Sequence, residues 1–438
     1  MQKTYTQNYI KIYFWQGISV VLNFLSMFVV IPFLTSDPIT YGIYSVCISF
    51  SIFLAYADLG FIGAGQKYAA EYFAKGDSEE EINVLGFTNF ILLVFLILFS
   101  IGFLILSFEP SLLVKGLYTS KQVSIASSLL LTLAFFTPIT LLQRLVQMIF
   151  GIRMEDFIIQ RTYILGSLLK IISVLWFFRN GEYDIVGYFF FIQLINLLAA
   201  LFTLTIAKKR YQYDFLTLFK RIGYNKVVFD KTKGLAFASL YLTLSWIFYY
   251  ELDSLVIGKF YGANQVAIYS IGLTVLSFFR SIYGILFSPF NIRFNHFIGQ
   301  GDDEGLKSFV LNVVTIMAPI VTIPILTIAI LVKPLVLSWV GTDYWESVEI
   351  VQYLILCNLF AFISYPMGML LMAKEQQKKM YIIATLLPVI FWIGILLTVR
   401  DQGVNSFAIF KLVAFIFPIT TWLLSIFSPQ TEIPNFLG

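Results

Sequence analysis

Long runs of apolar residues separated by short polar stretches make up most of the chain. A membrane-spanning helix needs about 20 mostly apolar residues, and twelve stretches meet this requirement. They cover residues 12–35, 40–58, 84–107, 123–148, 158–178, 185–207, 235–258, 266–289, 309–332, 350–372, 380–399 and 404–427. The pattern predicts an all-α polytopic membrane protein with twelve transmembrane helices.

The basic residues between these stretches predict an orientation. With the N-terminus placed in the cytoplasm, the inner segments carry 19 of the 29 Lys and Arg residues and the outer loops carry 6. Cytoplasmic loops of membrane proteins are enriched in Lys and Arg, so we expect both termini to be cytoplasmic. The first apolar stretch is too long for the core of a cleavable signal peptide, and we expect it to remain as the first span.

The chain resembles itself when it is shifted by 225 positions. Ile43-Tyr44-Ser45 then falls on Ile268-Tyr269-Ser270, and Gly76-Asp77-Ser78-Glu79 falls on Gly301-Asp302-Asp303-Glu304. Each half holds six spans, so both halves enter and leave the membrane on the same side. This predicts a parallel repeat of two six-helix bundles around a central cavity, a layout found among transporters. The predicted parts are residues 1–207, a basic cytoplasmic linker at 208–234, and residues 235–438.

The linker has an amphipathic segment of its own. Phe215, Leu216, Leu218 and Phe219 lie beside Lys220 and Arg221, as in a helix that lies on the surface of an anionic membrane. The alternative is a solvated linker that owes its charge to the orientation alone.

Composition supports a membrane protein and excludes several kinds of site. The chain is 59% hydrophobic and 12% charged, against about 25% charged residues in soluble proteins. Two cysteines and one histidine support neither a disulfide framework nor a transition-metal site. We therefore predict no cofactor, with membrane lipids as partners and no nucleic acid.

Four basic residues lie within the expected spans and are candidates for binding substrate. A charge at the centre of a spanning helix costs about 2.5–3.5 kcal/mol on insertion scales, so it needs a partner or an aqueous cavity. Arg280 and Lys170 are near the centres of their spans, while Arg144 and Lys411 are nearer the ends. A cationic cavity favours an anionic substrate, in particular a phosphate. Alternatively, these residues form structural pairs or extend to an interface.

Three acidic residues at span ends are candidates for ion coupling or for structural roles. Asp58 ends the second span, and Glu251 and Asp253 lie toward the outer end of the seventh. Any of them can carry a coupling proton or sodium ion, while capping and packing are the structural alternatives.

Eight prolines fall within the expected spans and predict kinks, because proline removes a helical hydrogen bond and clashes with the preceding turn. They are Pro32, Pro138, Pro289, Pro319, Pro324, Pro366, Pro388 and Pro418. Kinked helices suit a protein whose spans bend during gating.

Two junctions resemble those of a known family. Asp58-Leu59-Gly60-Phe61, followed by Lys67-Tyr68 and Gly76-Asp77, resembles the second-span exit of bacterial polysaccharide exporters. The run from Asp253 to Gly262, continuing through Val266-Ala267-Ile268-Tyr269-Ser270, resembles their seventh-to-eighth span junction. These exporters are the O-antigen flippases of the Wzx type, in the multidrug/oligosaccharidyl-lipid/polysaccharide exporter superfamily.

The resemblance implies a transporter of the bacterial inner membrane rather than an enzyme. Such flippases move undecaprenyl-pyrophosphate-linked oligosaccharide repeat units from the cytoplasmic to the periplasmic leaflet by alternating access, with a polymerase of the same pathway as a candidate partner. Their eighth span lines the cavity, which favours Arg280 as a headgroup ligand. Some relatives carry deep arginines on the first span, but none occurs between Ile12 and Ser36.

Other functions remain open at this point. A drug/cation antiporter of the same superfamily predicts a deep acidic site, whereas the deep charges here are mostly basic. A polymerase or ligase of the same pathway predicts a long outer loop with acid/base residues, whereas all the expected outer loops are short. A major-facilitator transporter predicts a basic glycine-rich loop after the second span, where this chain has Lys67-Tyr68-Ala69-Ala70-Glu71.

Overall fold

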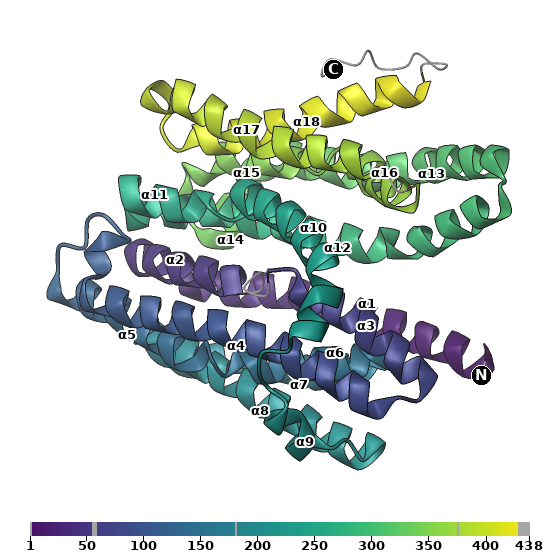
Figure 1. Cartoon of the computed structure of the whole chain (residues 1–438). Helices are drawn as coiled ribbons and strands as arrows, with labels where there is room; N and C mark the ends of the chain where they lie inside the picture. The colour runs from purple at the N-terminus through teal and green to yellow at the C-terminus, as the bar shows by residue number, and fades with distance from the viewer. Residues whose placement is uncertain (1, 55–58, 180–181, 375, 428–438) are drawn as a thin grey trace. The chain divides into compact units, whose positions relative to one another are not determined.

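The structure is a computed structural model that describes residues 2–54, 59–179, 182–374 and 376–427. These residues form eighteen α-helices and two short 3-10 helices, and they contain no strand (Figure 1). The prediction of an all-α polytopic membrane protein is confirmed. Every one of the twelve expected spans coincides with one helix or with a bent pair of helices.

The first six expected spans are helices of 13 to 33 residues. They are α1 (Gln2–Leu34), α2 (Pro38–Leu54), α4 (Ser78–Phe108), the pair α5 (Ser120–Phe136) and α6 (Thr140–Ile152), α7 (Asp156–Phe177) and α8 (Ile185–Tyr211). The short helix α3 (Phe61–Lys75) precedes α4, the 3-10 helix η1 (Pro110–Leu112) follows it, and α9 (Phe215–Lys220) lies within the linker.

The last six expected spans include two further bent pairs. They are α10 (Lys226–Tyr250) with α11 (Asp253–Tyr261), α12 (Ala263–Gln300), α13 (Asp303–Ile330), α15 (Ser347–Leu356) with α16 (Ala361–Ala373), α17 (Gln377–Gln402) and α18 (Asn405–Phe427). Helix α14 (Val332–Val340) and the 3-10 helix η2 (Thr342–Tyr344) connect α13 to α15. In the described part of the chain, seven helices are long and apolar enough to cross a membrane, or ten spans if each bent pair counts as one.

The chain forms two compact units. The first unit comprises Met1–Ser270 with Leu337–Tyr344, and the second comprises Ile271–Val336 with Trp345–Gly438. Within the first unit, α1 packs on α7, and α4 packs on both α3 and α5; within the second, α18 packs on α15 and α17. The division into six-helix halves around a linker at 208–234 remains a prediction.

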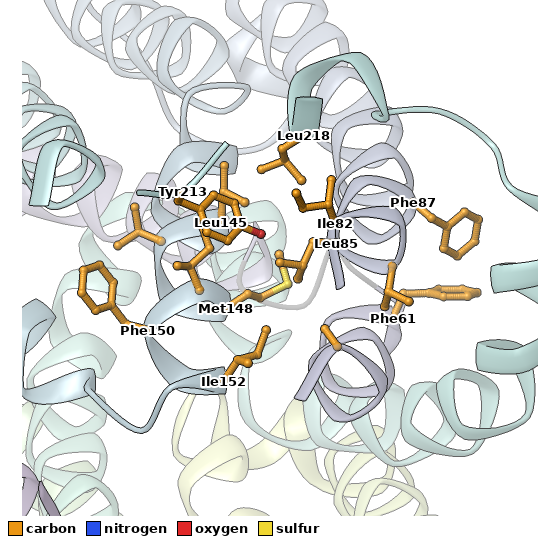
Figure 2. Close-up of a cluster of buried hydrophobic side chains, with 14 of the residues drawn as sticks. Phe61, Ile82, Leu85, Phe87, Leu145, Met148, Phe150, Ile152, Tyr213 and Leu218 are labelled. Carbon is orange, nitrogen blue, oxygen red and sulfur yellow. The ribbon is translucent and has the colours of Figure 1, made fainter. Parts of the chain in front are cut away.

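A hydrophobic cluster joins the linker to the first unit (Figure 2). Phe87 of α4 and Phe150 of α6 are fully buried in it, and so is Leu218 of α9. Helix α9 begins where the side chain of Asp214 accepts a hydrogen bond from the Thr217 amide, at 3.0 Å. The linker therefore packs against the rest of the first unit through buried apolar side chains, and it contains a short capped helix.

Apolar side chains also cover the outside of the helices, as expected in lipid. Leu165, Leu169, Ile172 and Trp176 follow one another along α7 at intervals of three or four residues, and all four are exposed. Side chains at this spacing share one helix face. A continuous apolar face of this kind faces the acyl chains of a bilayer.

Three spans are broken by bends of at least 40°. The α5–α6 and α15–α16 pairs are each bent by 45°, and the α10–α11 pair by 40°. Pro138 lies in the α5–α6 break, whereas Pro32, Pro319, Pro324, Pro366 and Pro388 lie inside continuous helices. The two 45° breaks interrupt the fourth and tenth spans, which occupy the same place in the two predicted halves.

Candidate functional site

A polar cavity of about 160 Å³ lies beside the α5–α6 break in the first unit. Helices α2, α5, α6 and α8 and the break itself line it. The lining residues are Ser51, Leu54, Leu133, Phe136, Thr137, Thr140, Gln143, Arg144, Gln193 and Asn196. Thr137 and Asn196 fall near the centres of the expected spans 123–148 and 185–207, so the cavity is at a depth where lipid would surround the protein.

Pro138 determines the local backbone at this cavity. Proline has no amide hydrogen and crowds the turn before it, which favours a break at this point. The chain instead forms tight turns, in which the Ile139 amide donates to the Phe136 carbonyl and the Thr140 amide donates to the Thr137 carbonyl, both at 3.1 Å. A broken span at mid-membrane depth is tolerated where its backbone lines a cavity.

The structure places Arg144 at this cavity and Lys170 beside one of its lining residues. Arg144 lines it, and its Nη1 donates a hydrogen bond to Gln147 Oε1 at 3.2 Å. Lys170 Nζ donates to Oδ1 of Asn196, a lining residue, at 2.7 Å. The cavity therefore has one basic lining residue, from α6, and a second basic residue, on α7, donates a hydrogen bond to the lining residue Asn196 of α8.

Two hydroxyl groups at the cavity have no hydrogen-bond partner among the described residues. Thr137 is only 1% exposed, and its Oγ1 is buried without a partner. The Oγ of Ser51 is likewise buried and has no partner. A buried hydroxyl without a partner destabilises the protein by about 1–3 kcal/mol.

Arg280 and Lys411 belong to the second unit. Arg280 is half-buried on α12, and its carbonyl accepts a hydrogen bond from Tyr365 Oη at 3.1 Å. Lys411 of α18 is fully buried, with its Nζ 5.3 Å from the centre of the Phe391 ring on α17. A cation facing an aromatic ring is stabilised by the negative face of the ring.

The predicted acidic residues lie at the α10–α11 break, which contains no proline. Glu251 directly follows the last residue of α10, and Asp253 is the first residue of α11. Both side chains are buried. Asp253 Oδ2 accepts a hydrogen bond from Tyr269 Oη at 2.7 Å, and its Oδ1 accepts one from the Ser254 amide at 2.9 Å. The third acidic candidate, Asp58, lies outside the described residues. No group of three or more His, Cys, Asp or Glu within the described ranges is placed to hold a metal ion.

The neutral polar residues of the cavity are absent from the sequence-based prediction. Thr137, Gln143, Gln193 and Asn196 all lie in spans that are otherwise apolar. Polar side chains in a spanning helix usually face protein or a water-filled cavity, and this signal was available in the sequence. Which of them share a cavity depends on the packing of four helices.

The described structure resembles several solved transporter structures. An inward-facing multidrug resistance MATE family transporter of the MOP superfamily has a TM-score of 0.74 at 13% identity, covering 93% of each chain. The lipid II flippase MurJ in an inward closed conformation has a TM-score of 0.69 at 14% identity, covering 97% of this chain and 88% of MurJ. An outward-facing MATE transporter has a TM-score of 0.61 at 15% identity.

The chain has the fold of these transporters. The sequence itself matches no family model and no curated protein. At such low identities the likeness establishes the fold, and it extends along almost the whole chain.

Proposed function

We propose that this protein is a flippase for undecaprenyl-pyrophosphate-linked oligosaccharide units of O-antigen or a related polysaccharide. It would move them from the cytoplasmic to the periplasmic leaflet of the bacterial inner membrane by alternating access. The fold shared with a lipid II flippase over 97% of this chain supports the proposal. The carrier lipid and surrounding membrane lipids are the expected partners, and a polymerase of the same pathway is a further candidate.

The four basic residues within the spans are the observation that carries this proposal. Arg144 lines a polar cavity, Lys170 hydrogen-bonds to Asn196 in the lining of that cavity, Lys411 is fully buried and Arg280 is half-buried. Guanidinium and ammonium groups recognise phosphate oxygens, and they do so more strongly where water is scarce. A cationic set of this kind fits a pyrophosphate-linked substrate better than it fits an organic cation.

Reconstitution into liposomes tests the proposal. A fluorescent undecaprenyl-pyrophosphate oligosaccharide is incorporated, and its transfer between leaflets is followed by a membrane-impermeant quencher. We expect transfer with the unchanged protein and at least a tenfold loss for Arg280→Ala, because a lost charge-assisted hydrogen bond weakens binding by this order. Arg400→Gln, which neutralises an exposed arginine in the last turn of α17, is the matched control and should transfer normally. Unimpaired transfer by Arg280→Ala would exclude its role at the headgroup.

A drug/cation antiporter is the second candidate function. The buried carboxyl of Asp253, held by Tyr269 at a helix break, favours it, since a buried carboxyl is a means of binding a proton or sodium ion. This function predicts that expression lowers the accumulation of a cationic dye and that Asp253→Asn abolishes the effect. Dye efflux without transfer of the lipid-linked oligosaccharide would favour this candidate over the flippase.

A further inference from the structure

Two cationic side chains, one on α1 and one on α7, lie over the same aromatic ring. Lys11 Nζ and Arg161 Cζ are each 5.4 Å from the centre of the Phe157 ring. The guanidinium of Arg161 also lies 4.6 Å from the centre of the Trp15 ring, which belongs to α1. Aromatic faces hold a cation in position and leave its N–H donors available. The packed pair of helices therefore presents two positioned cations beside each other.

The donors of these two cations are available to a ligand. Both side chains are exposed, and neither forms an ion pair within the described residues. Glu155 attracts Lys11, but Arg210 already holds the carboxylate of Glu155 with hydrogen bonds of 2.7 and 2.6 Å. An anion from outside the protein can therefore reach Lys11 and Arg161.

Arg161 stands at one end of the lipid-facing stripe of α7. It precedes Leu165 by four residues, and Leu169, Ile172 and Trp176 continue the stripe at intervals of three or four. Residues at this spacing share one face of a helix. The only charged side chain of this stripe is thus followed by four exposed apolar ones.

Lys11 has the same place on α1. The exposed side chains of Phe14, Val21, Leu25 and Phe28 follow it at intervals of three, four or seven residues, again on one helix face. Lys11 and Arg161 both lie near the start of their apolar spans, which cover Ile10–Leu34 and Asp156–Phe177. Each helix therefore combines a cation at the depth of the lipid headgroups with an apolar face at the depth of the acyl chains.

We propose that this α1–α7 surface binds an anionic phospholipid, with Lys11 and Arg161 at its phosphate and its acyl chains along the two apolar faces. In the orientation predicted from the sequence, the lipid belongs to the inner leaflet. The site does not depend on the function proposed above.

The combination of charge and apolar surface favours an anionic phospholipid over other ligands. Basic sites between spanning helices bind anionic lipid headgroups, and the planar fork of arginine matches two phosphate oxygens at once. Free phosphate would compensate the cations but would make no use of the apolar faces. A zwitterionic lipid carries an ammonium group of its own, which repels the two cations.

Photocrosslinking in nanodiscs tests the site with the full-length protein. The bilayer is phosphatidylcholine, and a minor component is phosphatidylglycerol with a diazirine on one acyl chain; diazirine-labelled phosphatidylcholine is the comparison probe. After illumination and chymotryptic digestion, mass spectrometry measures labelling of the α7 segment from Leu165 to Ile172. We expect phosphatidylglycerol to label this segment at least about fivefold more than phosphatidylcholine, because each basic residue near a phosphate strengthens binding by about this factor.

The double variant Lys11→Gln with Arg161→Gln should abolish this preference. The matched control is Lys75→Gln with Arg293→Gln, which removes the same charge. Lys75 and Arg293 are also exposed, and they also lie over rings, at 5.7 Å and 4.7 Å. The control should keep the preference. Equal labelling by the two probes in the unchanged protein, or equal loss in the two double variants, would overturn the proposal.

Two single variants separate the position of the guanidinium from its charge. Arg161→Lys keeps the charge without the planar fork, and Trp15→Leu removes the ring that holds the guanidinium. Each should lower the preference roughly two- to threefold. If the two cations only held α1 against α7, the double variant would lower the melting temperature and leave the preference unchanged, which would reject the lipid site.

Competition identifies the lipid. Unlabelled phosphatidylglycerol should suppress the labelling at a lower concentration than undecaprenyl phosphate does, which would support the phospholipid assignment. Stronger competition by undecaprenyl phosphate would overturn that assignment in favour of a carrier lipid, and competition by inorganic phosphate alone would overturn it in favour of a free anion.

Discussion

A buried ion pair holds the C-terminal end of α6 against α4. The Nη2 of Arg153 lies 2.9 Å from Oε1 of Glu81, and the two side chains are 9% and 2% exposed. The rings of Phe73, Tyr211 and Tyr213 lie over the guanidinium, with centroids 4.6 to 5.2 Å from its carbon. These contacts join α3, α4, α6, α8 and the start of the linker at a single residue.

Glu81→Gln should destabilise the protein strongly. Removing one member of a buried pair leaves an uncompensated charge and costs about 3–5 kcal/mol, so the midpoint of thermal unfolding in detergent should fall by several degrees. The double variant Glu81→Gln with Arg153→Met should recover part of this loss, because no unpaired charge remains.

Glu79→Gln provides the comparison for this pair. Glu79 pairs with Arg221 at 3.1 Å, but the two side chains are 73% and 49% exposed. An exposed pair contributes about 0–1 kcal/mol, so this variant should unfold near the temperature of the unchanged protein. Equal losses for Glu79→Gln and Glu81→Gln would contradict the burial argument.

At the scale of elements, the linker approaches α4 so closely that only glycine fits. A Cβ added to Gly86 would lie 2.5 Å from the carbonyl oxygen of Arg221 and 2.9 Å from its carbonyl carbon. Both are backbone atoms, so the linker itself would have to move. Gly86 therefore allows α9 to dock, and Leu218 to be buried.

Gly86→Ala should loosen the linker, by about 1–3 kcal/mol if the clash behaves as overpacking does in other cores. The measurement is limited proteolysis with trypsin, which should cleave the basic segment between Lys208 and Lys233 several-fold faster. Gly102→Ala is the control on the same helix, since nothing lies within 4 Å of its added Cβ. Its cleavage rate should be unchanged, and a matching acceleration would contradict the steric explanation.

The α5–α6 and α15–α16 breaks share one feature, a buried polar atom that has no partner among the described residues. In the α5–α6 break, Thr137 leaves a buried hydroxyl without a partner, and in the α15–α16 break the Nδ2 of buried Asn358 is likewise unpartnered among the described residues. The breaks lie in the fourth and tenth spans, and each bends by 45°. Interrupted spans at corresponding positions of two halves are a typical location for binding sites in transporters, which supports the proposed internal repeat.

At the scale of the whole molecule, the predicted orientation can be tested by labelling cysteines in intact cells. The native Cys47 and Cys357 are both buried, so they should contribute little background. With both termini cytoplasmic, Ser111→Cys after α4 should react with a membrane-impermeant maleimide from outside. Tyr224→Cys in the linker, at an exposed position, should react only after the membrane is permeabilised. The reverse labelling pattern would contradict the predicted orientation and place both termini outside the cytoplasm.

The sequence by itself determined the twelve spans and the positions of the charged residues within them. A bilayer offers the backbone no hydrogen-bond partner, so an apolar run of about 20 residues has to be a helix wherever it lies in the fold. Pro138 likewise predicted a distortion in the fourth span, because its ring removes one helical hydrogen bond and crowds the preceding turn. These properties depend only on neighbouring residues and the solvent.

Only the tertiary structure decided which side chains meet. Lys170 and Asn196 are 26 residues apart, and Arg153 and Glu81 are 72 apart. Their contacts depend on how each helix is rotated about its axis and on which helix it packs against. Apolar side chains are distributed nearly evenly around α4, α7 and α8, so hydropathy does not determine how these helices are rotated. For the same reason Arg144 is evident as a charge in the sequence, while the cavity that it lines together with Thr137 exists only in the packed protein.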